Sequence, residues 1–147
     1  SKPCYGITEL SRRKTFQRNS ADLLEIRASV SIIEGLSTKF RISGENGKSF
    51  EFGYDAKSKS IFIDRTHAWN EIPSSNVHSS PVTDEEKIID ICAIVDRASV
   101  EVFAAGGTCV VTDLLFLDGA RLSATFEITE GCQAPRSLAV RSISPRR

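Results

Sequence analysis

The sequence predicts an all-β protein, a β-sandwich of two antiparallel sheets. Apolar and polar residues alternate with a period of two in many short segments, which is the pattern of half-buried strands. Turn residues separate these segments at intervals of roughly 8 to 12 residues. No long stretch shows the period of an α-helix, and only residues 7–17 could form a helical turn or two. A single sheet of this length would leave one apolar face in water, so two packed sheets are expected.

A jelly-roll sandwich of the concanavalin or lectin-like type suits this number of strands, and a closed barrel is the alternative. The chain has 147 residues, of which 40% are hydrophobic and 26% charged, as expected for one globular domain. Nineteen basic and nineteen acidic side chains cancel, which argues against nucleic acid or an anionic membrane as a partner. No apolar run is long enough to span a bilayer and no signal peptide is recognisable, so we expect a soluble chain or a mature piece of a secreted one.

The first strands are expected at residues 24–32 and 36–42, joined by a turn at Glu34-Gly35. In the first of them Leu24 begins an alternation of apolar and polar side chains. The next two strands are expected at 50–54 and 61–63, the second leading into Asp64-Arg65.

Residues 88–116 give the clearest pattern, three consecutive antiparallel strands joined by two polar turns. Asp96-Arg97-Ala98 forms the first turn, and residues 104–107 form the second. Two further strands, at 122–128 and 138–140, bring the expected number to about nine.

The segment from Thr66 to Glu86 is the longest expected loop, and it contains the only tryptophan and both histidines. Long loops on rigid sheets often bind ligands. A flat indole beside charged side chains could stack on a sugar ring, so the candidate carbohydrate-binding residues are Asp64, Arg65, His67 and Trp69. The alternative is that Trp69 fixes the loop to the sandwich or covers an interface.

Other chemistry finds little support. The sequence has no phosphate-binding glycine loop, no Gly-x-Ser-x-Gly and no His-Glu-x-x-His. His67 and His78 lack a third ligand, and the acidic run at 84–86 is typical of a solvated loop, so we expect no metal, cofactor or catalytic residue. Cys92 and Cys109 are expected to be buried thiols on strands two apart, and a bridge between Cys4 and Cys132 is left open.

Two segments resemble a known family. Phe52-Gly53-Tyr54-Asp55, followed by residues 61–66, is similar to a pair of strands in the C-terminal domain of glycoside hydrolase family 32, the invertases, levanases and inulinases. Residues 95–103, with Gly107 and Thr112 after them, resemble that domain's Val-Asp-Arg-Ser-Ser-Val-Glu-Val-Phe signature, with Ala98 in place of a serine. The resemblance implies a β-sandwich of two antiparallel sheets, which agrees with the alternation.

The resemblance also implies what the chain lacks. Family catalysis uses two carboxylates on an N-terminal five-bladed β-propeller, and the motifs Asn-Asp-Pro-Asn, Arg-Asp-Pro and Glu-Cys do not occur in this sequence. We therefore expect a non-catalytic module, with residues 1–20 as a linker from an absent propeller and 21–147 as the sandwich. The motif residues are expected to be structural; they are Tyr54, Asp55, Asp96, Arg97, Glu101 and Phe103.

The propeller is the expected partner, and its enzyme would hydrolyse sucrose or fructan, outside the cell if the substrate is polymeric. Two alternatives are a stand-alone fructan-binding module and a sandwich interaction domain without a glycan role. Loss of the propeller would leave one sheet face exposed, so a homo-oligomer is also conceivable.

Overall fold

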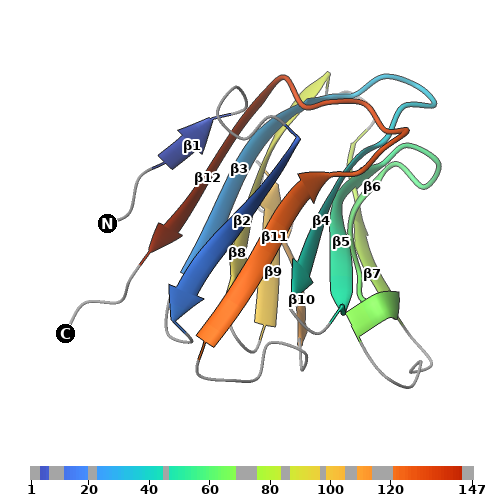
Figure 1. Cartoon of the computed structure of the whole chain (residues 1–147). Coiled ribbons are helices and arrows are strands. Elements are labelled where there is room, and N and C mark those ends of the chain that lie inside the picture. The colour runs from blue at the N-terminus through green and yellow to red at the C-terminus, as the bar shows by residue number, and fades with distance from the viewer. Residues whose placement is uncertain are drawn as a thin grey trace.

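The computed structural model describes residues 4–6, 12–19, 23–44, 47–68, 76–83, 87–96, 99–104, 109–113 and 121–143. These residues form twelve strands in two six-stranded antiparallel sheets. The strands of the two sheets lie in two layers, as Figure 1 shows. The predicted β-sandwich is therefore confirmed.

Both sheets contain strands from the whole length of the chain. Sheet A has the order β1 (Cys4–Gly6), β12 (Ser137–Ile143), β3 (Leu23–Ser31), β8 (Ile88–Val95), β9 (Ser99–Ala104), β10 (Cys109–Asp113). Sheet B has the order β2 (Arg13–Asn19), β11 (Arg121–Ile128), β4 (Thr38–Gly44), β5 (Ser49–Asp55), β6 (Ser60–Asp64), β7 (Val77–Pro81), and a 3₁₀ turn, η1 (Thr66–Ala68), follows β6.

The core lies between the inner faces of the two sheets, because every second side chain of each central strand points inward. Phe40 packs against Phe52 and Phe126, with ring centroids 5.3 and 5.6 Å away, in tilted and stacked arrangements that aromatic side chains favour. The largest fully buried side chains are Phe40, Phe50, Phe52, Phe126, Leu24, Ile26, Ile42, Ile61 and Ile63.

The double hairpin predicted between residues 88 and 116 is present as β8, β9 and β10. Asp96 closes its first turn: the Asp96 amide donates to the Ser99 carbonyl at 3.0 Å, and the Ser99 amide donates to Asp96 Oδ1 at 2.7 Å. Short polar side chains that accept a nearby amide in this way are the usual residues of such turns.

Three strands differ from the prediction. The sequence predicts a linker over residues 1–20, with a possible helical turn within 7–17. Within this range Cys4–Gly6 and Arg13–Asn19 instead form β1 and β2, each at an edge of its sheet. Residues 77–81, within the predicted long loop, form the edge strand β7. Edge strands pair on one side only and tolerate polar side chains, so Arg13-Lys14-Thr15 and Val77–Pro81 lack the alternation that marks the central strands.

Candidate functional site

The residues proposed for carbohydrate binding lie at the end of β6 and on η1. Asp64 Oδ1 accepts hydrogen bonds from the backbone amide of Thr66, at 2.9 Å, and from its hydroxyl. Asp64 therefore caps the 3₁₀ turn. Arg65 is half-buried, with its backbone amide bound to the Asn76 carbonyl at 2.9 Å, and His67 is exposed. Trp69 lies outside the described residues.

Asp64 also lines a polar groove on the outer face of sheet B. This groove has a volume of about 320 Å³ and is lined by Lys39, Asp55, Ser58, Phe62, Asp64, Val77 and Ser79. Sequence reasoning named two of these residues, Asp64 and Asp55, but placed them in separate groups. The register brings them to one face, because β5 pairs with both β4 and β6.

One aromatic ring lies in the groove, but it is covered. Phe62 is only 6% exposed, and Lys39 Nζ lies 5.5 Å from its ring centroid in a cation–π arrangement. Phe62 lies opposite Gly53, whose φ of +147° brings its Cα so close to Thr38 that a Cβ would overlap the Thr38 carbonyl oxygen. Phe62 therefore packs over Gly53, a position that only glycine can occupy without a clash. Its ring has no free face to offer to a sugar.

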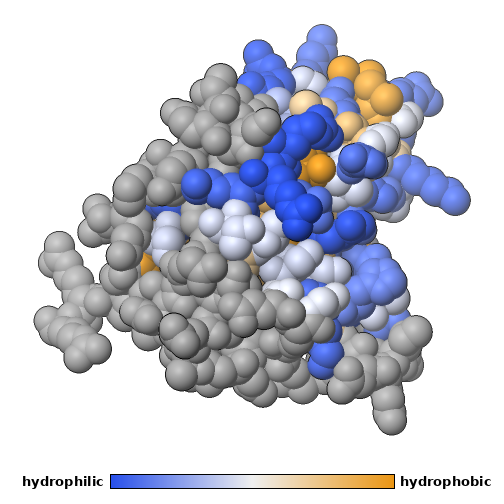
Figure 2. All heavy atoms as spheres, viewed as in Figure 1, coloured by the Kyte–Doolittle hydropathy of each residue, from blue (hydrophilic) through white to orange (hydrophobic). Residues whose placement is uncertain are grey.

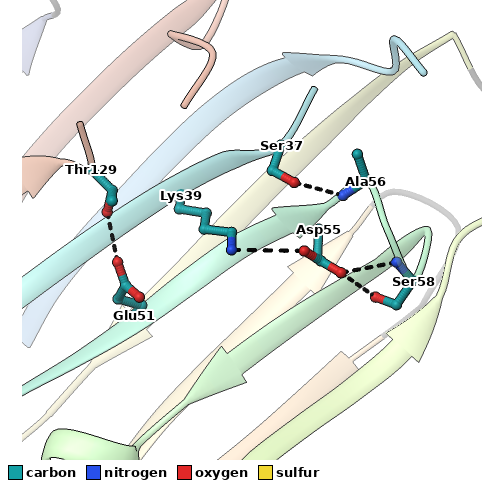
Figure 3. A network of polar contacts seen from close by, with 7 residues as sticks. All are labelled: Ser37, Lys39, Glu51, Asp55, Ala56, Ser58 and Thr129. Carbon is teal, nitrogen blue, oxygen red and sulfur yellow. Dashed lines mark hydrogen bonds and ion pairs between the residues drawn. The ribbon is translucent and has the colours of Figure 1, made fainter. Parts of the chain in front are cut away.

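The carboxylates of this face are bound by neighbouring side chains (Figure 3). Asp55 Oδ2 accepts from the amide and hydroxyl of Ser58, at 2.9 and 2.7 Å, and Lys39 Nζ lies 3.7 Å from Asp55 Oδ1. Burial of Asp55 opposes ionisation, but the hydrogen bonds from Ser58 and the charge of Lys39 outweigh it and lower the pKa.

Glu51 extends the same network towards β4 and the end of β11. Its Oε2 accepts from the Thr129 hydroxyl at 2.8 Å and from Arg41 at 3.3 Å. Ser37 accepts a hydrogen bond from the Ala56 amide at 2.8 Å, which holds the β5–β6 turn against the start of β4. The network ties strands and turns together.

A second cluster, absent from the sequence predictions, lies on the outer face of sheet A. Glu25 is 7% exposed and accepts from Arg141 Nε at 2.7 Å and Arg27 Nε at 3.3 Å. The hydrogen bond from Arg141, helped by Arg27, outweighs burial and lowers the pKa of Glu25. The alternation of charge at 25 and 27 was visible in the sequence, but Arg141 comes from a strand 116 residues away.

The motif residues take different positions. Tyr54 is 3% exposed in the core, whereas Phe103 is 37% exposed on the outer face of sheet A. Glu101 is half-buried on that same face, between Ile94 of β8 and Val111 of β10. Arg97 lies outside the described residues.

The cysteine predictions need correction. Cys132 is a free thiol, so the bridge to Cys4 that the sequence left open is not formed. Cys92 is also free, and it is half-buried on the outer face of sheet A because its strand alternates inward at Ile91 and Ala93. Burial raises the pKa of the Cys92 thiol, against the effect of Arg27. The Cys109 side chain lies outside the described part of the chain.

Within the described residues, no group of three or more His, Cys, Asp or Glu side chains could hold a metal ion. The same residues include no helix long and apolar enough to cross a membrane.

Fold and surface together define a β-sandwich domain in which Glu25, Glu51, Asp55 and Asp64 bind groups of its own turns and strands. The chain matches the family described as "Glycosyl hydrolases family 32 C terminal" over residues 3–140, and it belongs to that family.

Its relatives include the extracellular exo-inulinase of Aspergillus awamori, 30% identical over an alignment of 146 positions that covers 90% of this chain and 27% of the exo-inulinase. A levanase of Bacillus subtilis is 30% identical over 105 residues, covering 67% of this chain and 16% of the levanase. The chain thus spans about a quarter or less of these curated relatives.

Solved structures share the fold. The crystal structure of the Aspergillus awamori exo-inulinase superposes with a TM-score of 0.63 at 23% identity, covering 91% of this chain and 29% of the exo-inulinase. A fructofuranosidase of Schwanniomyces occidentalis complexed with fructosylnystose gives a TM-score of 0.60 at 15% identity, covering 90% of this chain and 31% of the enzyme.

Proposed function

We propose that this chain is the non-catalytic C-terminal module of a β-fructofuranosidase-type enzyme and that it stabilises the catalytic domain preceding it. The observation that carries the proposal is the match to the C-terminal part of family 32 over residues 3–140. Relatives named exo-inulinase and levanase extend well beyond the matched segment, so most of each enzyme lies elsewhere in its chain. Sucrose or a fructan is the substrate class we assign to the whole enzyme, and a polymeric substrate would place it outside the cell.

The chemistry of the described carboxylates supports a non-catalytic module. Retaining glycoside hydrolysis uses two carboxyl groups about 5 Å apart, one of which must be protonated to act as the acid. Asp55 instead has a lowered pKa and is bound by Ser58 and Lys39. Asp64 and Glu51 are likewise engaged by Thr66 and Thr129. All three side chains act as hydrogen-bond acceptors that fix local structure.

The alternative of a stand-alone fructan-binding module stays a prediction that no observation favours. Carbohydrate sites usually present an open aromatic face beside polar groups. In the groove of sheet B, Lys39 covers Phe62, and Asp55 and Asp64 are bound within the protein.

Fructose release tests the proposal. Residues 1–147, purified alone, should release no fructose from sucrose, inulin or levan beyond a buffer blank, with an exo-inulinase as the positive control. Fructose release by the isolated chain that disappears in Asp55→Asn or Asp64→Asn would sink the non-catalytic assignment.

A further inference from the structure

The outer faces of the two sheets differ in character. On sheet B, one cross-strand row alternates in charge, because Arg13, Glu127, Arg41 and Glu51 lie opposite one another in turn. Arg41 lies 3.3 Å from Glu51 and 3.8 Å from Glu127, so these charges neutralise each other. The coloured part of the surface in Figure 2 is mostly hydrophilic to neutral, apart from an apolar cluster at the upper right. Such a face is suited to water.

The outer face of sheet A instead exposes large apolar side chains on adjacent strands. Ile88, Phe103 and Val111 are 42%, 37% and 52% exposed. Half-buried Cys92 lies directly opposite Phe103, and half-buried Ile94 lies in the row that contains Glu101 and Val111. We call these five apolar residues of β8, β9 and β10 the apolar patch.

A groove of about 460 Å³ runs beside the apolar patch across β12, β3, β8 and β9. Small side chains at Ser29, Cys92 and Ala139 leave room in this face. The larger side chains of Arg27, Asp90 and Phe103 also line the groove. Side chains of a partner could enter this space and reach two charged groups at its sides.

Three charged side chains next to the apolar patch, Glu25, Arg27 and Arg141, are already paired within the sheet. Glu25 holds Arg141 and Arg27 at 2.7 and 3.3 Å, so covering this part of the face would not bury an isolated charge. An apolar centre bordered by paired or exposed polar groups is the usual composition of a protein interface.

We infer that the outer face of sheet A docks the catalytic domain preceding this chain in the same polypeptide, an inference that rests on the proposed function. The matched segment is 27% of the exo-inulinase and represents the C-terminal part of its family, which leaves a large preceding part as the available partner. β1 is the described strand nearest the N-terminus, and it pairs with β12 in sheet A. A polypeptide that continues from the preceding domain therefore joins sheet A before it joins sheet B.

Thiol labelling tests the docking face. Cys92 lies in the proposed interface and Cys132 lies in the turn region after β11, and both are free and half-buried. N-ethylmaleimide labelling, followed by peptide mapping, should be at least tenfold slower at Cys92 in a polypeptide carrying the catalytic domain than in residues 1–147 alone. The Cys132 rate should be unchanged.

A matched pair of substitutions gives an independent readout. Val111 on sheet A and Val77 on sheet B are both 52% exposed and both lie on edge strands. In the two-domain polypeptide, Val111→Lys should shorten the thermal half-life of fructose release at least fivefold, and Val77→Lys should change it less than twofold.

Equal Cys92 labelling rates with and without the catalytic domain would overturn the docking face. The proposed function would survive that result if removal of the chain still destabilised the enzyme, so the two failures are distinguishable. Concentration-dependent protection of Cys92 in the isolated chain, with none added by the catalytic domain, would assign the face to self-association and also overturn the inference.

Discussion

Single carboxylates hold the turns of this sandwich. Asp55, Asp64 and Asp96 each accept a backbone amide two or three residues further along the chain. Such contacts are local, which is why sequence motifs could indicate a structural task for Asp55 and Asp96, whereas Asp64 was assigned to carbohydrate binding. The Glu25 cluster could not be predicted in the same way, because strand pairing across 116 residues brings Arg141 to it.

The Glu25 cluster makes a pH-dependent contribution to stability. Because its folded-state pKa is lowered, Glu25 stabilises the fold above its unfolded pKa, and this contribution is lost as the pH falls through the folded pKa. Glu25→Gln should therefore cost about 1–2 kcal/mol at pH 7, a value moderated by the partial exposure of both arginines. Urea unfolding at a series of pH values should show the difference from wild type shrinking towards acid.

Glu127→Gln is the matched control for that experiment, since Glu127 is more exposed and lies 3.8 Å from Arg41. Its cost at pH 7 should be below about 0.5 kcal/mol. A Glu25→Gln variant whose cost is equally small and does not change with pH would argue against the cluster.

At the scale of strands, alternation predicted the central elements and the edge strand β10 but missed the edge strands β1, β2 and β7. β3, β8 and β9 bury every second side chain, so their pattern is readable in the sequence. β7 has no buried residue, and its Val-His-Ser-Ser-Pro sequence gives no apolar signal. Pairing to one neighbour, rather than burial, makes it a strand.

In β5, the close approach of the backbone to Thr38 depends on a single residue, Gly53. A side chain there would need φ near +147° and would overlap the Thr38 carbonyl. Gly53→Ala should destabilise the domain by at least ~2 kcal/mol in urea unfolding.

Gly131→Ala provides the comparison, because Gly131 also has a positive φ, +78°, but no atom lies within 4 Å of the position that a Cβ would occupy there. Its cost should stay near ~1 kcal/mol, from backbone strain alone. Equal costs at the two glycines would show that the close approach of Gly53 to Thr38 is unimportant.

At the scale of the molecule, sequence motifs led to the family and the fold, and the structure added the contrast between the two sheet faces. That contrast depends on register: Phe103, Val111 and Cys92 come together only when β8, β9 and β10 are aligned. Neither periodicity nor motif specified which face a partner would cover. The overall composition did not indicate this face either, because the basic and acidic side chains cancel over the whole chain.

The most direct test of a stabilising, non-catalytic module is the thermal inactivation of fructose release. A polypeptide in which this chain follows a family 32 catalytic domain should be compared with the same polypeptide lacking residues 1–147. We predict that the truncated form keeps the catalytic groups but inactivates at a temperature several degrees lower, since each kcal/mol lost shifts the midpoint by about 2–4 °C in domains of 150–250 residues. Identical inactivation temperatures for the two forms would contradict the account.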